Sequence, residues 1–573
     1  MKKSRRRKWT VVGIILVALV LTVLVARMSG GPPRGSVLEV AVKGEIPEAI
    51  PAGPVGQILA AKRLTVRDYV EGILRARDDR RINGLLVSID SSSLGLAKVQ
   101  ELRDAVLDFR KSGKWTVAFM ETAGEFSPGT REYYLATACD AIWMVPSGDV
   151  NLTGIRLEVS FIRGTLDKLG IYPDYDHIGK YKTFKNFFTD TSMTPAYRES
   201  MESIADSYYR QIRSGIAGGR GLTEAQAAAL IDKGPILGPQ AIEARLVDSL
   251  GYRDQIEAHL KEKNGGKLPI VKLRHYLKSG RFYDRGVKVA LVYGVGLVTR
   301  GENAYDPLVN GPMMGSDTVA EAIKKAREDG SVKAIVFRVD SPGGSYVASD
   351  IIWRQVMLTR GVKPIVVTMS DVAGSGGYFV AMQADRIIAE PGTLTASIGV
   401  LAGKFVTRGF WEKLGITRDA VQRGRHATFY SGSARYTPEE RAIFEQWLRR
   451  IYQDFVGKAA TGRDRTFNQI DAIAQGRVWT GEDAKRLGLI DEVGGLPQAV
   501  RRALELAKID PSRPVNLVVF PRPKSLLQEV LSGGEETRAG ISALQASVRK
   551  ALDEGPGRGP ETILEMPFVP RME

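Results

Sequence analysis

The segment INGLLVSIDSSSLGLAKVQELRDAV, residues 82–106, returns in altered form as VKAIVFRVDSPGGSYVASDIIWRQV, residues 332–356. Each version passes from a short apolar run, through an aspartate, into a stretch whose apolar residues have helical spacing. Asp340 in the second version lies 250 positions after Asp90 in the first. A supersecondary unit that recurs in this way indicates an internal duplication of the chain.

The correspondence continues downstream at a nearly constant offset. YYLATACDAIWMVP at 133–146 matches YFVAMQADRIIAEP at 378–391, and KLGIYPDYDHIGKYKTF at 168–184 matches KLGITRDAVQRGRHATF at 413–429. The offset drifts by only a few residues, as loop insertions would produce. We therefore predict two tandem copies of one domain, at residues 36–275 and 286–520.

Each copy has the pattern of an α/β domain. TVRDYVEGILRAR at 65–77 places apolar residues at helical spacing behind a threonine that can cap the helix. GLLVSID at 84–90 and AIVFRVD at 334–340 are short apolar runs, typical of buried parallel strands. Helices that alternate with such strands favour parallel βα units with right-handed crossovers.

The N-terminus predicts a membrane anchor. Six of the first eight residues are basic, and TVVGIILVALVLTVLVA at 10–26 has no charge. An apolar helix of that length nearly crosses a hydrocarbon core. We predict a basic cytoplasmic segment at 1–9 and a transmembrane anchor at 10–27, which puts the rest of the chain outside the inner membrane. A cleavable signal peptide is the alternative.

Composition limits the classes of partner and of site that the protein can have. The formal net charge is +16, but the N-terminal cluster supplies part of it and the rest forms no basic stripe, so we expect no nucleic-acid partner. The single cysteine, Cys139, excludes an intrachain disulfide and a multi-cysteine metal site. Nothing in the sequence indicates a metal or an organic cofactor. We expect residues 521–573 to form a flexible or partly helical tail.

The two copies differ where chemistry is expected. In the second copy, Ser375 stands among glycines in SDVAGSGGYF, just before a helical stretch, whereas Thr130 occupies the matching position in GTREY. DSPGGS at 340–345 becomes DSSSLG at 90–95, without the paired glycines. Features of a catalytic serine therefore occur in the second copy alone.

A serine hydroxyl needs a base to take its proton. None of the four histidines lies in a recognisable base motif. Lys182, in GKYKTF, corresponds to Ala427 in the second copy, so each copy would supply one half of a site. A free lysine has a pKa of about 10.4, and burial can lower it far enough for a neutral amine to act as base. Lys180 and Lys185 are close alternatives.

Stabilising an oxyanion requires N–H donors, commonly from the backbone. Gly343 and Gly344 directly follow a predicted strand, where glycines can present their amides without obstruction by Cβ. The amide of Gly376, just after the serine, is the second natural donor.

In the ordered motifs DSPGGS, SDVAGSGGYF, TLTASIG and GKYKTF, the chain resembles signal peptide peptidase A, also called protease IV, in its long, duplicated bacterial form. The resemblance implies a Clp protease/crotonase-like ββα fold in each copy and a catalytic dyad of Ser375 and Lys182. It also implies that Ser397 orients the lysine. The family cleaves remnant signal peptides and other apolar peptides as a homotetramer at the bacterial inner membrane, with its catalytic domains on the periplasmic side.

Three other functions remain open at this stage. A crotonase-like acyl-CoA enzyme would share the fold but would need neither Ser375 nor Lys182. An α/β-hydrolase could use Asp419 and His426, which follow the serine in the order of that fold. A catalytically inactive membrane scaffold would use the duplicated fold for assembly only.

Overall fold

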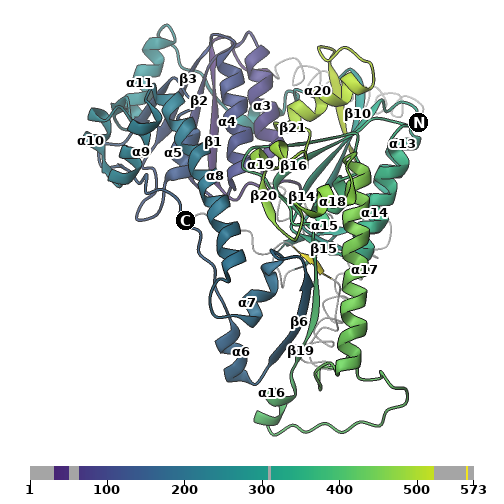
Figure 1. Cartoon of the computed structure of the whole chain (residues 1–573). Helices are drawn as coiled ribbons and strands as arrows, with labels where there is room; N and C mark the ends of the chain where they lie inside the picture. Colours follow the sequence, from purple (N-terminus) through teal and green to yellow (C-terminus); the bar gives the residue numbers. More distant parts are fainter. Residues whose placement is uncertain (1–30, 51–62, 307–310, 522–562, 566–573) are drawn as a thin grey trace, which may run out of the picture.

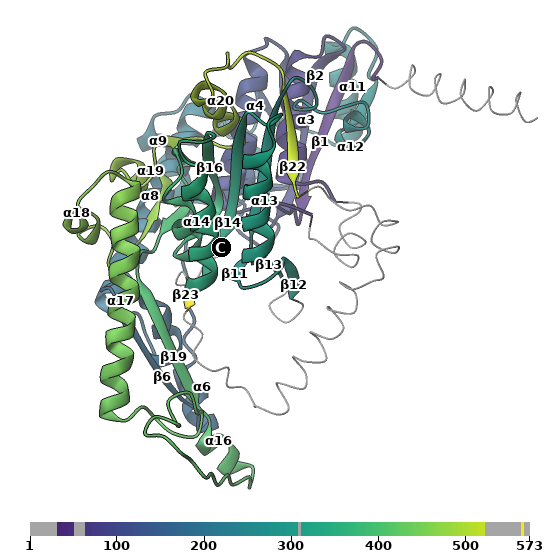
Figure 2. The same cartoon turned by 90° about the vertical axis from the view of Figure 1, so that its right-hand side faces the viewer.

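The computed structural model describes residues 31–50, 63–306, 311–521 and 563–565. In Figure 1 the first copy occupies the upper left of the molecule and the second copy the right, and strands from both copies extend downward as a shared arm. Figure 2 shows the same arm below the body of the second copy.

The first copy is built on a six-stranded sheet in the order β8-β4-β3-β2-β1-β9, in which all neighbours are parallel. Its helices follow the strands as the sequence pattern predicts, and Thr65 caps the first of them. The elements are β1 (Ser36–Gly44), α3 (Val66–Asp78), β2 (Ile82–Ser92), α4 (Leu96–Arg110), β3 (Trp115–Met120), α5 (Thr130–Ala136), β4 (Ala141–Met144), β8 (Ser249–Leu250) and β9 (Ile270–Lys272).

The second copy repeats this strand order as β21-β17-β16-β14-β10-β22, again with all neighbours parallel. It adds β18, which is parallel to β16, and β20, which pairs antiparallel with β18. The predicted duplication and the parallel α/β class are therefore confirmed. The elements are β10 (Val287–Val295), α13 (Ser316–Glu328), β14 (Ala334–Ser341), α14 (Tyr346–Thr359), β16 (Ile365–Gly374), α15 (Gly376–Ala381), β17 (Arg386–Ala389), β18 (Leu394–Ala396), β20 (Val478–Thr480), β21 (Glu492–Val493), α20 (Leu496–Leu506) and β22 (Val515–Phe520).

A third sheet joins the two copies. Its order is β12-β13-β11-β15-β23-β19-β6, and β6 of the first copy runs antiparallel to β19 of the second over seven paired residues. This ladder forms the arm in Figure 1. The strands are β6 (Tyr172–Ile178), β11 (Leu297–Thr299), β12 (Ala304–Asp306), β13 (Gly311–Gly315), β15 (Gly343–Ser345), β19 (Val400–Val406) and β23 (Ile563–Glu565).

A long helix follows the arm segment in each copy. Both helices begin with a Thr-Pro pair, in which the threonine accepts a backbone N–H and proline occupies the first turn. They are α8 (Pro195–Arg220) and α17 (Pro438–Gly462). The remaining elements are β5 (Asp149–Val150), α6 (Arg163–Leu169), η1 (Thr183–Lys185), α7 (Asn186–Thr189), α9 (Glu224–Lys233), β7 (Ile236–Leu237), α10 (Gly238–Glu243), α11 (Arg253–Lys263), α12 (Leu273–Leu277), α16 (Arg408–Lys413), α18 (Phe467–Asp471) and α19 (Gly481–Arg486).

The predicted terminal segments fall largely outside the described residues, including the basic segment 1–9 and the anchor 10–27. Across the part of the chain that the structure describes, no helix is both long enough and apolar enough to cross a membrane. Of the tail 521–573, residues 563–565 form strand β23, which the prediction of a flexible or partly helical tail missed.

Candidate active site

Ser375 lies at the junction between β16 and α15 and is fully buried. Its backbone has φ 53° and ψ −111°, a region that residues other than glycine rarely occupy. Hydrogen bonds hold the residue on both sides, because its N–H donates to the Ala396 carbonyl at 2.7 Å and its carbonyl accepts from Phe379 N at 2.8 Å. Such a conformation costs on the order of 1–3 kcal/mol and occurs where a side chain must be aimed at a site.

Lys182 reaches Ser375 from the first copy. It follows β6 in a short turn, and its side chain is fully buried. Nζ lies 2.6 Å from Ser375 Oγ, 3.1 Å from Ser397 Oγ and 3.2 Å from the Ser397 carbonyl oxygen. The structure therefore brings together the two residues that the copies were predicted to contribute.

A glycine of the second copy makes room for the lysine turn. A Cβ on Gly476, which has φ +76°, would lie 2.5 Å from the backbone nitrogen of Lys182. Next to it, Tyr181 N donates to the Gln475 carbonyl at 2.6 Å. The position of Lys182 is thus set by contacts between the copies, which a local sequence pattern cannot specify.

Ser397 is held by an unusual turn after β18. Ala396 and Ser397 both have positive φ, 66° and 53°, and Ser397 N donates to the Arg477 carbonyl at 2.9 Å. This turn directs both oxygen atoms of Ser397 to Lys182 Nζ. Thr153, the matching residue of the first copy, is exposed.

The three glycines predicted to supply oxyanion donors also meet beside Ser375. Gly343 and Gly344 have φ +110° and +148°, and a Cβ on Gly344 would lie 2.2 Å from the Val298 carbonyl oxygen. A Cβ on Gly376 would lie 3.1 Å from both Gly343 Cα and Gly344 N. The absence of side chains therefore permits this close approach. The Gly343 N–H donates to Ser341 Oγ at 3.2 Å.

The alternative bases lie elsewhere. Lys180 is exposed and donates to the Tyr181 hydroxyl, and Lys185 pairs with Asp176 at 3.7 Å. His426 lies 3.8 Å from Glu439 on the surface, and Asp419 is exposed. No group of three or more histidine, cysteine or acidic residues that could hold a metal ion occurs among the residues described.

The sequence of the chain matches a known peptidase family. The sequence model of peptidase family S49 matches residues 108–267 and 358–510, one segment in each copy. The chain belongs to peptidase family S49.

Several curated relatives of this S49 chain carry the names of proteases. It is 34% identical over 541 residues to the chloroplastic serine protease SPPA of Arabidopsis thaliana. The aligned region covers 91% of this chain and 76% of that protein. The chain is 32% identical over 460 residues to protease 4 of Salmonella typhi, covering 77% of this chain and 72% of the relative. The family and these relatives identify the chain as a serine peptidase.

Among solved structures, a ClpP1 mutant from Listeria monocytogenes matches 36% of this chain and 93% of its own, with 13% identity and a TM-score of 0.23. Likeness at that score carries no argument. The α/β class and the duplication rest on the strand order described above.

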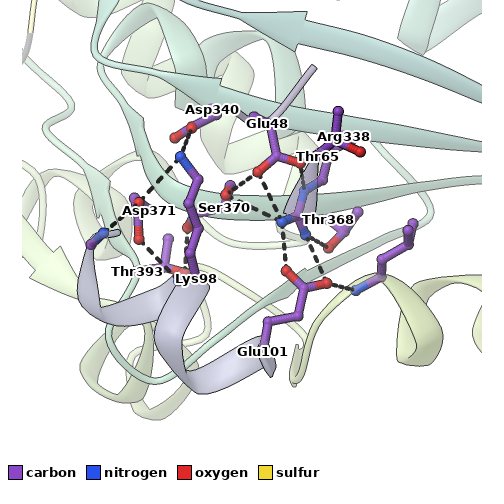
Figure 3. Close-up of polar contacts among 12 residues, drawn as sticks. Glu48, Thr65, Lys98, Glu101, Arg338, Asp340, Thr368, Ser370, Asp371 and Thr393 are labelled. Atoms are coloured by element: carbon purple, nitrogen blue, oxygen red, sulfur yellow. Dashed lines mark hydrogen bonds and ion pairs between the residues drawn. The ribbon is translucent and has the colours of Figure 1, made fainter. Parts of the chain in front are cut away.

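The sequence did not predict a buried charge cluster between the two copies of this S49 peptidase (Figure 3). Arg338, inside β14, binds Glu48 at 2.8 Å and Glu101 at 2.6 Å, and all three side chains are almost completely buried. Burial raises the pKa of Glu48, but the charges of Arg338 and Lys98 and the hydrogen bonds from Arg338 and Ser370 together lower it below its ordinary value. The one available signal was a charged residue inside the otherwise apolar strand AIVFRVD.

Lys98 of α4 forms the other half of this cluster. Its Nζ lies 2.6 Å from Asp340 and 3.2 Å from Asp371. Burial would lower the pKa of Lys98, but the two carboxylates raise it, so the side chain is an ammonium. Asp340 accepts from Lys98 Nζ and from the backbone N–H of Val372, the latter at 3.1 Å.

Glu390 is a second buried acid that the sequence analysis did not single out. Neither of its carboxylate oxygens has a hydrogen-bond partner within the described part of the chain. Burial, then the nearby Asp104 and Glu101, raise its pKa well above the ordinary value. The neutral acid is the form that this environment accommodates.

Proposed function

We propose that this S49 peptidase is a membrane-anchored serine endopeptidase in which Ser375 is the nucleophile and Lys182 the general base. The observation that carries the proposal is the 2.6 Å separation of Lys182 Nζ and Ser375 Oγ in a fully buried setting. Burial away from water disfavours an ammonium, so the neutral amine, which carries a lone pair, is favoured there. That lone pair can accept the serine proton.

The other contacts of Lys182 support this role. A neutral amine has two hydrogens to donate, and Ser397 offers two acceptors, its hydroxyl and its carbonyl oxygen. Donation to Ser397 leaves the lone pair aimed at Ser375. In this proposal Ser397 orients the base rather than taking part in bond making.

The reaction then follows from these positions. Lys182 removes the Ser375 proton as Oγ attacks the peptide carbonyl, and the oxyanion forms beside the backbone of Gly343, Gly344 and Gly376. Collapse of this intermediate transfers the lysine proton to the leaving amine and leaves an acyl-serine. Lys182 then takes a proton from water, which hydrolyses the ester and frees Ser375.

We also propose the cellular setting from the sequence. The uncharged stretch 10–26 behind a basic cluster supports a single-pass anchor with the catalytic domains outside the bacterial inner membrane. Remnant signal peptides and other apolar peptides, which are close to that membrane, are the proposed substrates. The resemblance to signal peptide peptidase A supports a homotetramer.

The test is hydrolysis of a short apolar peptide amide by full-length protein in detergent, for wild type, Ser375→Ala, Lys182→Ala and the control Lys180→Ala. The first two variants should lose activity at unchanged size by light scattering, and the control should retain it because Lys180 lies on the surface. Full activity of Lys182→Ala would refute the base assignment. A wild type inert to peptides and to serine-directed probes would favour the scaffold, or an acyl-CoA enzyme if it binds acyl-CoA.

A further inference from the structure

The strand that leads to Ser375 contains a bulge. In the parallel pair β14–β16, Val339 is opposite Met369 and Ser341 is opposite Ala373. One residue of β14, Asp340, therefore faces three residues of β16, 370–372. After the bulge β16 continues to Ser375, while β14 continues to Gly343 and Gly344. The bulge thus sets the distance between Ser375 and the pair Gly343–Gly344, which we call the glycine turn.

The first copy holds this bulge with side chains. The Ser370 hydroxyl donates to Glu48 at 2.6 Å and accepts from Arg338 at 3.2 Å. The Asp371 carboxylate accepts the backbone N–H groups of Gly95 and Lys98 at the start of α4, at 3.1 and 3.0 Å. Figure 3 shows α4 lying against the bulge with these side chains between them.

Lys98 links the two strands directly. Its ammonium contacts Asp340 of β14 at 2.6 Å and Asp371 of β16 at 3.2 Å, while Asp340 also accepts Val372 N of the bulge. The corresponding residue of the second copy, 250 positions later, is Ala348. The second copy therefore has no cation of its own at the matching position of its helix.

We infer that Lys98 is a positioning residue of the active site, because it fixes the bulge and thereby the spacing between Ser375 and the Gly343–Gly344 turn. The inference rests on the proposed function. It differs from a contribution to folding alone, because a small shift of the serine relative to its oxyanion donors lowers the rate of bond making while leaving substrate binding elsewhere intact. A displacement of about 1 Å in such a site can cost about 10²-fold in rate.

The test is Lys98→Met in the full-length protein, since methionine keeps the length of the side chain and removes the charge. We expect kcat to fall about 10- to 100-fold with KM changed by less than about twofold. Lys98→Arg, which can still bridge two carboxylates, should recover most of kcat. Lys288→Met is the matched control, because it breaks an ion pair of 2.7 Å with Asp329 at the other end of the same sheet, and kcat should not change.

Hydrogen exchange gives a readout that does not depend on activity. In Lys98→Met the amides of 341–345 and 370–376 should exchange faster than in wild type, while those of the β6–β19 arm should not. A folded Lys98→Met with wild-type kcat and exchange would overturn the inference. If wild type fails to cleave peptides, the proposed function fails, and the exchange comparison still decides whether Lys98 holds the bulge. Should Lys98→Met not fold, Lys98→Gln replaces it in both assays.

Discussion

The two copies share a strand order but differ at the turn between the third strand and its helix. In the first copy Thr130 is already the first residue of α5, and its hydroxyl donates to the Gly154 carbonyl at 3.2 Å. In the second copy Ser375 precedes α15 in a strained conformation, and its hydroxyl meets Lys182. Both copies therefore have a hydroxyl-bearing residue at this junction, but only the second has the strained turn that brings the hydroxyl to a lysine.

At the repeated segment GKYKTF/GRHATF the difference is reversed, because here the first copy has the reactive residue type and the second copy has alanine. Lys182 is fully buried against the second copy, while the matching Ala427 is exposed. In the proposed site, each copy therefore contributes one half of the Ser–Lys pair, which would give one site per chain. Changes that make one copy resemble the other test this proposal.

Ser375→Thr gives the second copy the residue of the first and should have the largest effect. A β-branched residue at φ 53° is strained, and a hindered hydroxyl is a poorer nucleophile. We expect the rate of peptide hydrolysis to fall by about 10³-fold or more. Covalent labelling of the protein by a fluorophosphonate should be lost as well. Retention of both in the folded variant would show that Ser375 is not the nucleophile.

Lys182→Ala makes the complementary exchange. Loss of general base catalysis should lower kcat about 10²- to 10⁴-fold and change KM little, as steady-state kinetics with a peptide amide can measure. The matched change in the other copy, Ala427→Lys, should have no effect because residue 427 is exposed. An equal effect of both substitutions would contradict the complementary arrangement.

Gly344→Ala tests the glycine turn that the first copy has replaced. The new Cβ would lie 2.2 Å from the Val298 carbonyl oxygen, at φ +148°. We expect a loss of about 2–3 kcal/mol in the free energy of unfolding, measured by urea denaturation, together with a lower kcat. Gly330→Ala is the control, since a Cβ there meets nothing within 4 Å. Equal stabilities of the two variants would argue against the close packing.

Glu390→Gln should have the smallest effect, and the effect should depend on pH. The first copy has valine at the matching position, Val145. Because the pKa of Glu390 is raised in the folded state, its contribution to stability is intact below its unfolded pKa and is lost as pH rises toward the folded value. Glutamine should therefore raise the free energy of unfolding by about 1 kcal/mol at pH 7.5 and by little at pH 4.5.

Thermal unfolding at the two pH values measures this difference. Val145→Gln in the first copy is a control for the amide itself. An equal gain for Glu390→Gln at both pH values would show that the carboxyl does not titrate as its surroundings indicate.

Much of this arrangement could be predicted because it is local or repeated. The helical spacing of apolar residues and the capping threonine predicted α3, and short apolar runs predicted the strands around Asp90 and Asp340. The repeated motifs predicted the duplication, and differences between the copies pointed to Ser375 and Lys182. The β6–β19 ladder could not be predicted, because its two strands are not matching segments of the repeat. Residues 417–423, which match β6 in sequence, form no strand, and β6 pairs instead with a different segment of the second copy. The charge cluster around Arg338 escaped for a related reason, since its partners are about 240 to 290 residues away in the chain.

Strand β23 has a consequence for any peptide that approaches the glycine turn. It pairs antiparallel with β15 and contacts β19 at Leu401, so the backbone of Gly343–Ser345 already has a neighbour on that side. An incoming extended peptide that pairs with the same backbone must displace residues 563–565. A tethered competitor of this kind is present at a local concentration that dilution does not change, so the fraction of sites it occupies is independent of protein concentration.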